Sequence, residues 1–188
     1  MTESLKGKVL LAGKFLRDPN FFKTVILVLE HDDTSAMGLV INRPSNVSVA
    51  HALAEHFQLP ATSDLIYVGG PVEPTALCML HNKTTPELAP HTLIPGVVIA
   101  NSAEMFEDIV QQACQPKSPR RYRIFSGYAG WGAEQLEGEI ERGDWYIHRA
   151  CADHLFNHDP YALYDMLLSN FAKSHTTFEI PREHVEWN

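Results

Sequence analysis

The hydrophobic residues of this chain fall mainly in short runs, and these runs predict β-strands. The run at 24–29, TVILVL, is continuous and rich in β-branched residues, which is typical of a strand covered on both faces. The polar segment at 32–35 predicts a turn, and the run at 37–41 predicts a second strand that completes a hairpin. By the same pattern, further strands are expected at 9–12, 65–68, 76–80, 97–100, 122–125 and 145–147.

Apolar residues at helical spacing predict two helices in the middle of the chain. Ser48 can cap a helix over 48–57, in which every fourth residue is apolar. Asn101 and Glu104 are spaced as in a capping box, and the apolar stripe behind them predicts a helix that reaches 113.

Two more helices are expected toward the C-terminus. The first spans 133–142 and is stopped by Gly143. Asp159 followed by Pro160 predicts the start of the second, because an N-cap residue followed by proline favours a first helical turn. Helices and strands do not alternate regularly, which favours an α+β fold with a mixed, largely antiparallel sheet.

Composition supports one folded domain over residues 1–188. Of these residues 45% are hydrophobic and 20% charged, ordinary values for a globular protein. A chain of this length buries roughly 70% of the surface that its unfolded form exposes, which excludes a disulfide-dependent mini-protein. The first residues lack a signal-peptide pattern, and no run approaches the roughly 20 apolar residues that span a bilayer. We therefore expect a soluble, cytoplasmic protein with no membrane partner.

The charge balance bears on nucleic acid as a partner. Fifteen Lys and Arg residues against 23 Asp and Glu residues give a net charge of −8. A field of this sign repels a polyanion, so DNA binding is disfavoured but not excluded. The best local exception is 117–123, KSPRRYR, for which a solvated loop is the simpler interpretation.

Catalytic motifs are scarce. His31, Asp32 and Asp33 resemble the His-Asp pair of metal phosphohydrolases, which makes a metal-dependent hydrolase one alternative, although the triplet falls in a predicted turn. His154 and His158 are four residues apart in a segment expected to be a loop. The chain has no GxSxG, GxGxxG or P-loop motif. We expect no cofactor, no bound metal and no catalytic residue, and we favour a non-enzymatic role.

The three cysteines, Cys78, Cys114 and Cys151, lie 36 and 37 residues apart. An odd number without compact spacing argues against a disulfide framework or a metal site. Each has apolar neighbours, so buried or half-buried free thiols are expected.

Three clusters are harder to explain by packing alone. They are Asn42-Arg43-Pro44, Gly69-Gly70-Pro71 and the glycine-rich segment 127–132, and each is expected where a strand ends. Glycine allows a close approach of a ligand, arginine can hold a carboxylate or phosphate with two hydrogen bonds, and aromatic rings offer flat amphipathic surfaces. If the strand ends converge, they form a ligand-binding recess. Its candidate residues are Asn42, Arg43, Gly69, Gly70, Tyr128 and Trp131.

The alternative interpretation is structural. All six would then be turn or packing residues, with Trp131 covering a core and Arg43 pairing with a carboxylate. The sequence leaves both interpretations open.

Three long segments of the sequence resemble the AlgH/YqgE family of bacterial proteins. They are LLAGKFLRDPNFFKTVILVLEHDDTSAMGLVINRPS, YVGGPV and GYAGWGAEQLEGEIERGDWYI, which together span about residues 10–147 in the family's order. The chain departs from the family pattern at Gly13-Lys14-Phe15 and at Ala133-Glu134.

The resemblance implies an α+β fold around a strongly curved, barrel-like sheet with flanking helices. It supplies no catalytic residues. Some family members are described as transcriptional regulators, which makes direct action on DNA a second alternative. Our leading hypothesis is a non-enzymatic cytoplasmic regulatory or binding protein that recognises a small anionic ligand or a protein partner through the six candidate residues.

Overall fold

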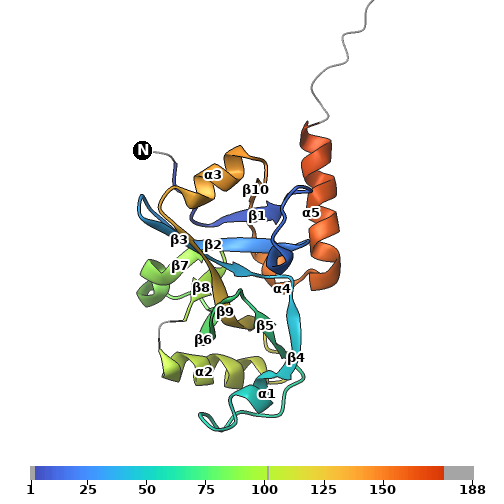
Figure 1. Cartoon of the computed structure of the whole chain (residues 1–188). Coiled ribbons are helices and arrows are strands. Elements are labelled where there is room, and N and C mark those ends of the chain that lie inside the picture. Colours follow the sequence, from blue (N-terminus) through green and yellow to red (C-terminus); the bar gives the residue numbers. More distant parts are fainter. Residues whose placement is uncertain (1–2, 101, 176–188) are drawn as a thin grey trace, which may run out of the picture.

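The computed structural model describes residues 3–100 and 102–175, and within them ten strands form one strongly curled sheet (Figure 1). The strands are β1 (Lys8–Ala12), β2 (Val25–His31), β3 (Ser35–Val40), β4 (Pro44–Ser48), β5 (Leu65–Val68), β6 (Val72–His81), β7 (Thr92–Ile94), β8 (Val97–Ile99), β9 (Tyr122–Gly132) and β10 (Trp145–Arg149). Eight follow one another in the order β10-β1-β2-β3-β9-β6-β8-β7, while β5 pairs with β4 and β9. The β5–β9 pair is parallel and the other described pairs are antiparallel, which confirms the mixed, largely antiparallel α+β fold.

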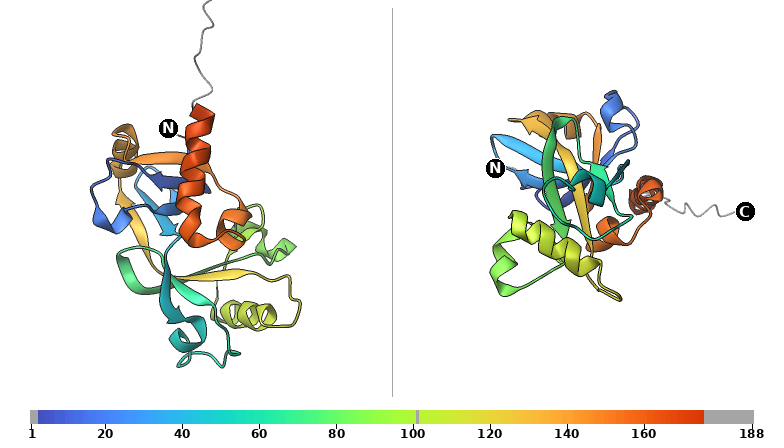
Figure 2. Two further views of the ribbon diagram at one scale, coloured as in Figure 1. Left: turned by 90° about the vertical axis from the view of Figure 1, so that its right-hand side faces the viewer. Right: turned by 90° about the horizontal axis from the view of Figure 1, so that it is seen from below.

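Five α-helices and two 3₁₀ turns accompany the sheet in the described part of the chain. They are η1 (Pro19–Phe21), α1 (Val49–Ala52), η2 (Pro86–His91), α2 (Ala103–Ala113), α3 (Gln135–Glu141), α4 (Ala152–Phe156) and α5 (Pro160–His175). Figure 2 shows α2 and α5 outside the curl and well apart from each other. None of the described helices combines the length and apolar character that a membrane span needs.

The predicted central hairpin is confirmed as β2 and β3. Val25 to Leu29 are all buried, as expected for a strand covered on both faces. The turn is held by Asp32, whose carboxylate accepts the backbone N–H groups of Thr34 and Ser35 at 2.8 and 3.0 Å.

The predicted start of the last helix is also confirmed. Asp159 accepts the N–H of Tyr161 at 3.0 Å, and α5 begins at Pro160. The helix packs Leu163, Tyr164 and Leu167 into the main core, beside β1.

The sequence predicted that the glycine-rich segment 127–132 lies where a strand ends. This prediction is wrong, because the segment lies inside β9. The strand continues because its residues 129–132 pair with β3, and Gly127 lets the β5–β6 connection cross it closely. A Cβ added to Gly70 would lie 2.1 Å from the backbone carbon of Tyr128, and one added to Gly127 would lie 2.5 Å from the carbonyl oxygen of Gly70. Gly127 also has a φ of +69°, which favours glycine. Gly70 and Gly127 thus allow close contact between backbone segments, whereas a Cβ on Gly130 or Gly132 would meet nothing closer than 3.5 Å.

Two predicted helices have different bounds. The helix expected over 48–57 is regular only over α1, although its apolar residues Val49 and Leu53 are buried as predicted. The α2 helix is capped by Ser102, whose hydroxyl accepts the N–H of Met105 at 3.2 Å, and the predicted cap Asn101 lies outside the described residues. A serine hydroxyl provides this cap one residue later than predicted.

The curl of the sheet brings its two edge strands, β7 and β10, toward each other. A Cβ added to Gly7, just before β1, would lie 2.9 Å from Ile94 of β7. One added to Gly96, in the β7–β8 turn, would lie 3.4 Å from Ala152 at the start of α4. The strands of these two edges are not paired, so a seam remains where the half-barrel fails to close.

Candidate functional site

Asn42 and Arg43 fasten the loop that contains η1 to the start of β2. The Asn42 side chain accepts the N–H of Val25 at 2.9 Å and donates to the carbonyl of Lys23 at 2.9 Å. The Arg43 guanidinium donates to the carbonyl of Asn20, and to that of Phe22 at 3.0 Å. Burial lowers the pKa of Arg43. The guanidinium therefore holds backbone carbonyls, where the sequence predicted either a ligand anion or a carboxylate.

Trp131 belongs to an aromatic cluster on the other side of the same loop. Its indole N–H donates to Glu139 at 2.9 Å, and the indole of Trp145 donates to the same carboxylate oxygen at 2.8 Å. Phe21 of η1 stacks on Trp131 and meets Trp145 edge-on, with ring centroids 6.5 and 5.6 Å apart. Trp131 thus covers a core, as the structural interpretation of the sequence expects.

Gly69, Gly70 and Tyr128 lie together at the crossing of the β5–β6 connection over β9. Gly69 donates to the carbonyl of Ser126 at 2.8 Å, and the Tyr128 hydroxyl lies 3.3 Å from Glu73. The structure thus brings three candidates together here. Arg43 lies beside them, because its carbonyl accepts the N–H of Val68, the residue before Gly69, at 2.9 Å, and Asn42 and Arg43 line a recess of about 510 Å³ with Val68. Trp131 lies farther along β9 and is connected to Arg43 through the η1 loop. Ligand binding by these six residues stays a prediction.

His31, at the end of β2, is hydrogen-bonded to the N-terminal segment and to α3. Its Nδ1 accepts the N–H of Leu5 at 3.0 Å, which leaves the proton on Nε2 for donation to Glu137 at 2.8 Å. Its side chain is only 5% exposed. Among the described residues, no group of three or more His, Cys, Asp or Glu side chains is arranged to hold a metal ion. The histidine of the hydrolase hypothesis therefore has a structural role.

Of the arginines in the basic segment 117–123, Arg121 is exposed and bonds within its own loop, whereas Arg123 is turned toward the sheet. Arg121 donates to the carbonyl groups of Ser118 and Arg120 at 3.0 and 2.9 Å. Arg123 lies 4.5 Å over the ring of Tyr67. Arg123 is therefore engaged within the fold, while Arg121 remains exposed, and DNA binding by this segment stays a prediction.

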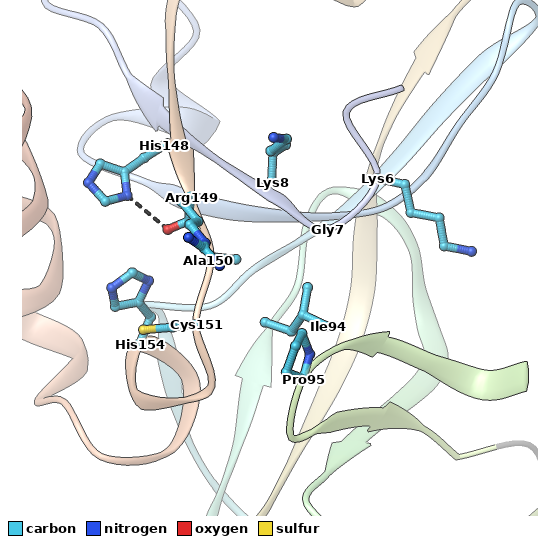
Figure 3. A pocket seen from close by; sticks show the side chains of 10 residues that line it. All are labelled: Lys6, Gly7, Lys8, Ile94, Pro95, His148, Arg149, Ala150, Cys151 and His154. Atoms are coloured by element: carbon cyan, nitrogen blue, oxygen red, sulfur yellow. Dashed lines mark hydrogen bonds between the residues drawn. The ribbon is translucent and has the colours of Figure 1, made fainter. Parts of the chain in front are cut away.

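A different site lies in the seam between the sheet edges, which we call the seam recess (Figure 3). Its volume is about 580 Å³, and it is bounded by the start of β1, the end of β10, the start of α4 and the β7–β8 turn. Its lining residues are Lys6, Gly7, Lys8, Ile94, Pro95, His148, Arg149, Ala150, Cys151 and His154.

The lining of the seam recess is basic. Lys6, Lys8 and Arg149 supply three cations, and none of the described lining residues is an aspartate or glutamate. Lys8 has one acidic neighbour, Glu3, at 3.9 Å, but the Glu3 side chain is 90% exposed and such surface pairs are weak. The recess is therefore a local site of positive charge on a chain of net charge −8.

Two histidines form one wall of the recess (Figure 3). His148 Nδ1 lies 2.9 Å from the Arg149 carbonyl, and because a carbonyl only accepts, Nδ1 is the donor of this hydrogen bond. The ring of His154 lies 5.9 Å from those of His148 and His158. His154 is 9% exposed and its Nδ1 is buried without a hydrogen-bond partner among the described residues. Burial lowers the pKa of His154, and the neighbouring imidazoles lower it further.

Sequence patterns missed this site because its residues come from segments far apart in the chain. Only the pair His154 and His158 drew attention to this region, and as a metal hypothesis. A further correction concerns Cys151, which is exposed, whereas Cys78 and Cys114 are half-buried as predicted.

Comparisons with known proteins identify the family. The sequence profile of a family described as AlgH-like matches residues 9–175. A UPF0301 protein from Myxococcus xanthus is 35% identical over 169 residues, which cover 88% of this chain and 90% of that protein. A UPF0301 protein from Marinomonas sp. is 41% identical over 162 residues, or 82% of each chain.

Two solved structures share the fold. The solution structure of the AlgH protein from Pseudomonas aeruginosa matches with a TM-score of 0.72 at 28% identity, covering 97% of this chain and 98% of that one. The crystal structure of DIP2367 from Corynebacterium diphtheriae has the same TM-score at 22% identity, with 90% and 88% coverage, and supports the fold alone. On sequence and structure together, this chain belongs to the AlgH-like family.

Proposed function

We propose that this chain is a non-enzymatic, cytoplasmic binding protein with a regulatory role, and that it holds a small anionic ligand in the seam recess. The observation that carries the proposal is the lining, which gathers Lys6, Lys8 and Arg149 without a carboxylate. A protein of net charge −8 repels small anions over most of its surface, so a basic concavity concentrates them at one place.

The size and chemistry of the recess suit a small molecule. Its volume of about 580 Å³ lies within the range of small-molecule sites. Arg149 offers a planar fork of donors for a carboxylate or phosphate. Ile94 and Pro95, on the opposite side in Figure 3, provide an apolar surface for the rest of the ligand.

The proposal keeps the anionic ligand expected from the sequence but moves its site. The sequence analysis expected Arg43 to bind the anion, but its guanidinium donates to backbone carbonyls. Arg149 is exposed at the recess.

A thermal-shift screen tests the proposal with inorganic phosphate, sulfate, sugar phosphates, nucleotides and dicarboxylates. A ligand at 100 times its Kd raises the unfolding free energy by about 2.7 kcal/mol, which is roughly 5–10 °C for a domain of this size. We expect a shift in the wild type that is lost in Arg149→Gln and kept in Arg17→Gln, a matched charge change at an exposed position outside the recess. A shift equally strong in Arg149→Gln, or no shift with any compound, would overturn the proposal.

A further inference from the structure

We infer that Cys151 is a reversible thiol-modification site that takes small anionic disulfides, with the resulting mixed disulfide lying in the seam recess. This inference rests on the proposed anion-binding function. It adds a covalent step and names the nucleophile.

Cys151 is the accessible thiol of the described chain. It is free, exposed and part of the recess lining, immediately before α4. Cys78 and Cys114 are half-buried, and burial raises the pKa of Cys78 to about 11. A buried thiol with a raised pKa is a poor nucleophile, since the thiolate is the reactive form. Accessibility therefore favours Cys151 over the other two.

His154 is an independent sign that the recess is built for a polar occupant. Its backbone N–H donates to the carbonyl of Cys151 at 3.2 Å, so the two residues share the first turn of α4. Its side chain lines the recess, is about nine-tenths buried, and leaves Nδ1 without a partner in the described structure. A buried polar atom without a hydrogen-bond partner destabilises the fold unless a bound group pairs with it. A polar group bound in the recess would supply that partner.

The positive charges of the recess favour reaction with anionic over neutral disulfides. Lys6, Lys8 and Arg149 attract an anionic reagent to the recess, and they hold its carboxylates once the mixed disulfide has formed. A neutral disulfide gains neither effect. The selectivity thus arises from the charge around the thiol and not from an unusual thiol.

The reaction is a balanced thiol–disulfide exchange. The Cys151 thiolate attacks one sulfur of the anionic disulfide, a new S–S bond forms, and the old S–S bond breaks. The departing thiolate carries away the electron pair, so Cys151 is oxidised to the mixed disulfide and half of the reagent is reduced. A small thiol reverses the step by attacking the same bond, which frees the recess again.

The test compares an anionic with a neutral disulfide reagent on the full chain. The dianionic 5,5′-dithiobis(2-nitrobenzoate) and the neutral 2,2′-dithiodipyridine are each reacted with wild type, with Cys151→Ser, and with the combined Lys6→Gln, Lys8→Gln, Arg149→Gln variant. Peptide mapping locates the modified cysteine. Dividing each variant's rate by the wild-type rate with the same reagent removes the intrinsic reactivity of the two reagents.

We expect fast labelling at Cys151 that is absent from Cys151→Ser. In the charge variant, the anionic reagent slows about tenfold relative to the neutral one, and added salt shrinks the difference in the wild type. Arg17→Gln leaves the ratio unchanged. Labelling mainly at Cys114, or an unchanged ratio in the charge variant, would overturn the inference.

The two proposals fail in distinguishable ways. If phosphate or sulfate still stabilises the wild type but not Arg149→Gln, while the rate ratio is unaffected by charge, the anion site stands and the thiol inference is wrong. If neither ion stabilises the wild type, the proposed function itself is wrong.

Discussion

Two regions of this molecule contain an arginine, glycine and aromatic or imidazole rings, but among the described residues only the second has a buried polar atom without a partner. In the cluster predicted from the sequence, Arg43 donates to two backbone carbonyls, and the indole of Trp131 is bonded to Glu139. In the seam recess, Arg149 is exposed and the Nδ1 of His154 is buried without a partner among the described residues.

The difference shows that residue type alone does not decide whether a side chain binds a ligand. An arginine beside glycines is a binding residue only if its donors are not already engaged within the fold. Our proposal assigns a stabilising role to the predicted cluster and a binding role to the recess, where the buried Nδ1 of His154 without a partner lowers stability. Substitutions in the first region should therefore affect unfolding, and substitutions in the second should affect binding.

The largest effect is expected at Gly70. In Gly70→Ala, the new Cβ would lie 2.1 Å from the Tyr128 backbone, which cannot move aside without breaking the crossing over β9. We expect a loss of more than about 4 kcal/mol in unfolding free energy, or failure to fold, measured by urea denaturation. Gly132→Ala is the matched control, because its Cβ would meet nothing closer than 4.0 Å. A stable Gly70→Ala protein that loses only ligand binding would make the predicted cluster functional after all.

His81 sharpens the comparison because, within the described structure, it also has a buried nitrogen without a partner but does not line the seam recess. Its side chain is fully buried, Nδ1 accepts the N–H of Lys83, and Nε2 has no partner among the described residues. Burial lowers the pKa of His81 to about 4, helped by the charges of Lys83 and Arg120. The unfolded chain therefore binds the proton more tightly, and the unfolding free energy falls as pH falls from about 6.5 toward 4.

We expect His81 to account for a loss of roughly 3 kcal/mol over this pH range. His81→Asn keeps an acceptor for the Lys83 N–H but does not titrate, so its stability should decline less on acidification. Chemical denaturation at pH 7 and pH 4.5 measures the difference, and 50 mM sulfate should not restore it. Equal losses in both proteins would show that His81 is not the titrating group.

A smaller loss of stability is expected at Glu139. Glu139→Ala removes the acceptor of two indole N–H groups and should lower the unfolding free energy by about 2 kcal/mol. Glu139→Gln retains an oxygen acceptor and should lose less. The exposed Glu141→Ala is the control, with an expected change within about 0.5 kcal/mol. An unchanged melting temperature in Glu139→Ala would contradict the structural role of this cluster.

The smallest effect concerns the pH dependence of anion binding. The groups facing His154 are His148 and His158, which lower its pKa, and Asp153, which raises it. An anion in the recess favours the protonated ring, so sulfate, whose charge is constant in this range, should bind about threefold more tightly at pH 5.5 than at pH 7.5, a difference below 1 kcal/mol. Calorimetric titration should show a flatter pH profile for His154→Asn. An identical profile would exclude His154 from the site.

Local patterns were enough to predict most strands, the β2–β3 hairpin and the start of α5, because these depend on neighbours in the sequence. They could not show that β9 continues through residues 127–132, since that depends on pairing with β3 and on the close crossing of Gly70 over Gly127. They also could not show the hydrogen-bond partners of Arg43, because a sequence does not indicate whether a guanidinium donates to backbone carbonyls or is free to bind a ligand.

The seam recess was out of reach of sequence patterns for a different reason. It exists because β1 pairs with β10, more than 130 residues later, and because the curl of the sheet then brings Ile94 against Gly7. The curvature that brings the two sheet edges together depends on the whole fold, and no short sequence motif predicts it. The family resemblance anticipated the curved sheet but not the site.

The most direct test is a titration of isotope-labelled protein with inorganic phosphate and with sulfate, followed by NMR of the backbone amides and the imidazole nitrogens. The seam recess as the anion site predicts saturable shifts at Lys6, Lys8, Arg149 and the rings of His148 and His154. It predicts no shifts at Asn42, Arg43, Gly69, Gly70, Tyr128 and Trp131. Saturable shifts confined to those six residues would contradict the account and restore the site predicted from the sequence.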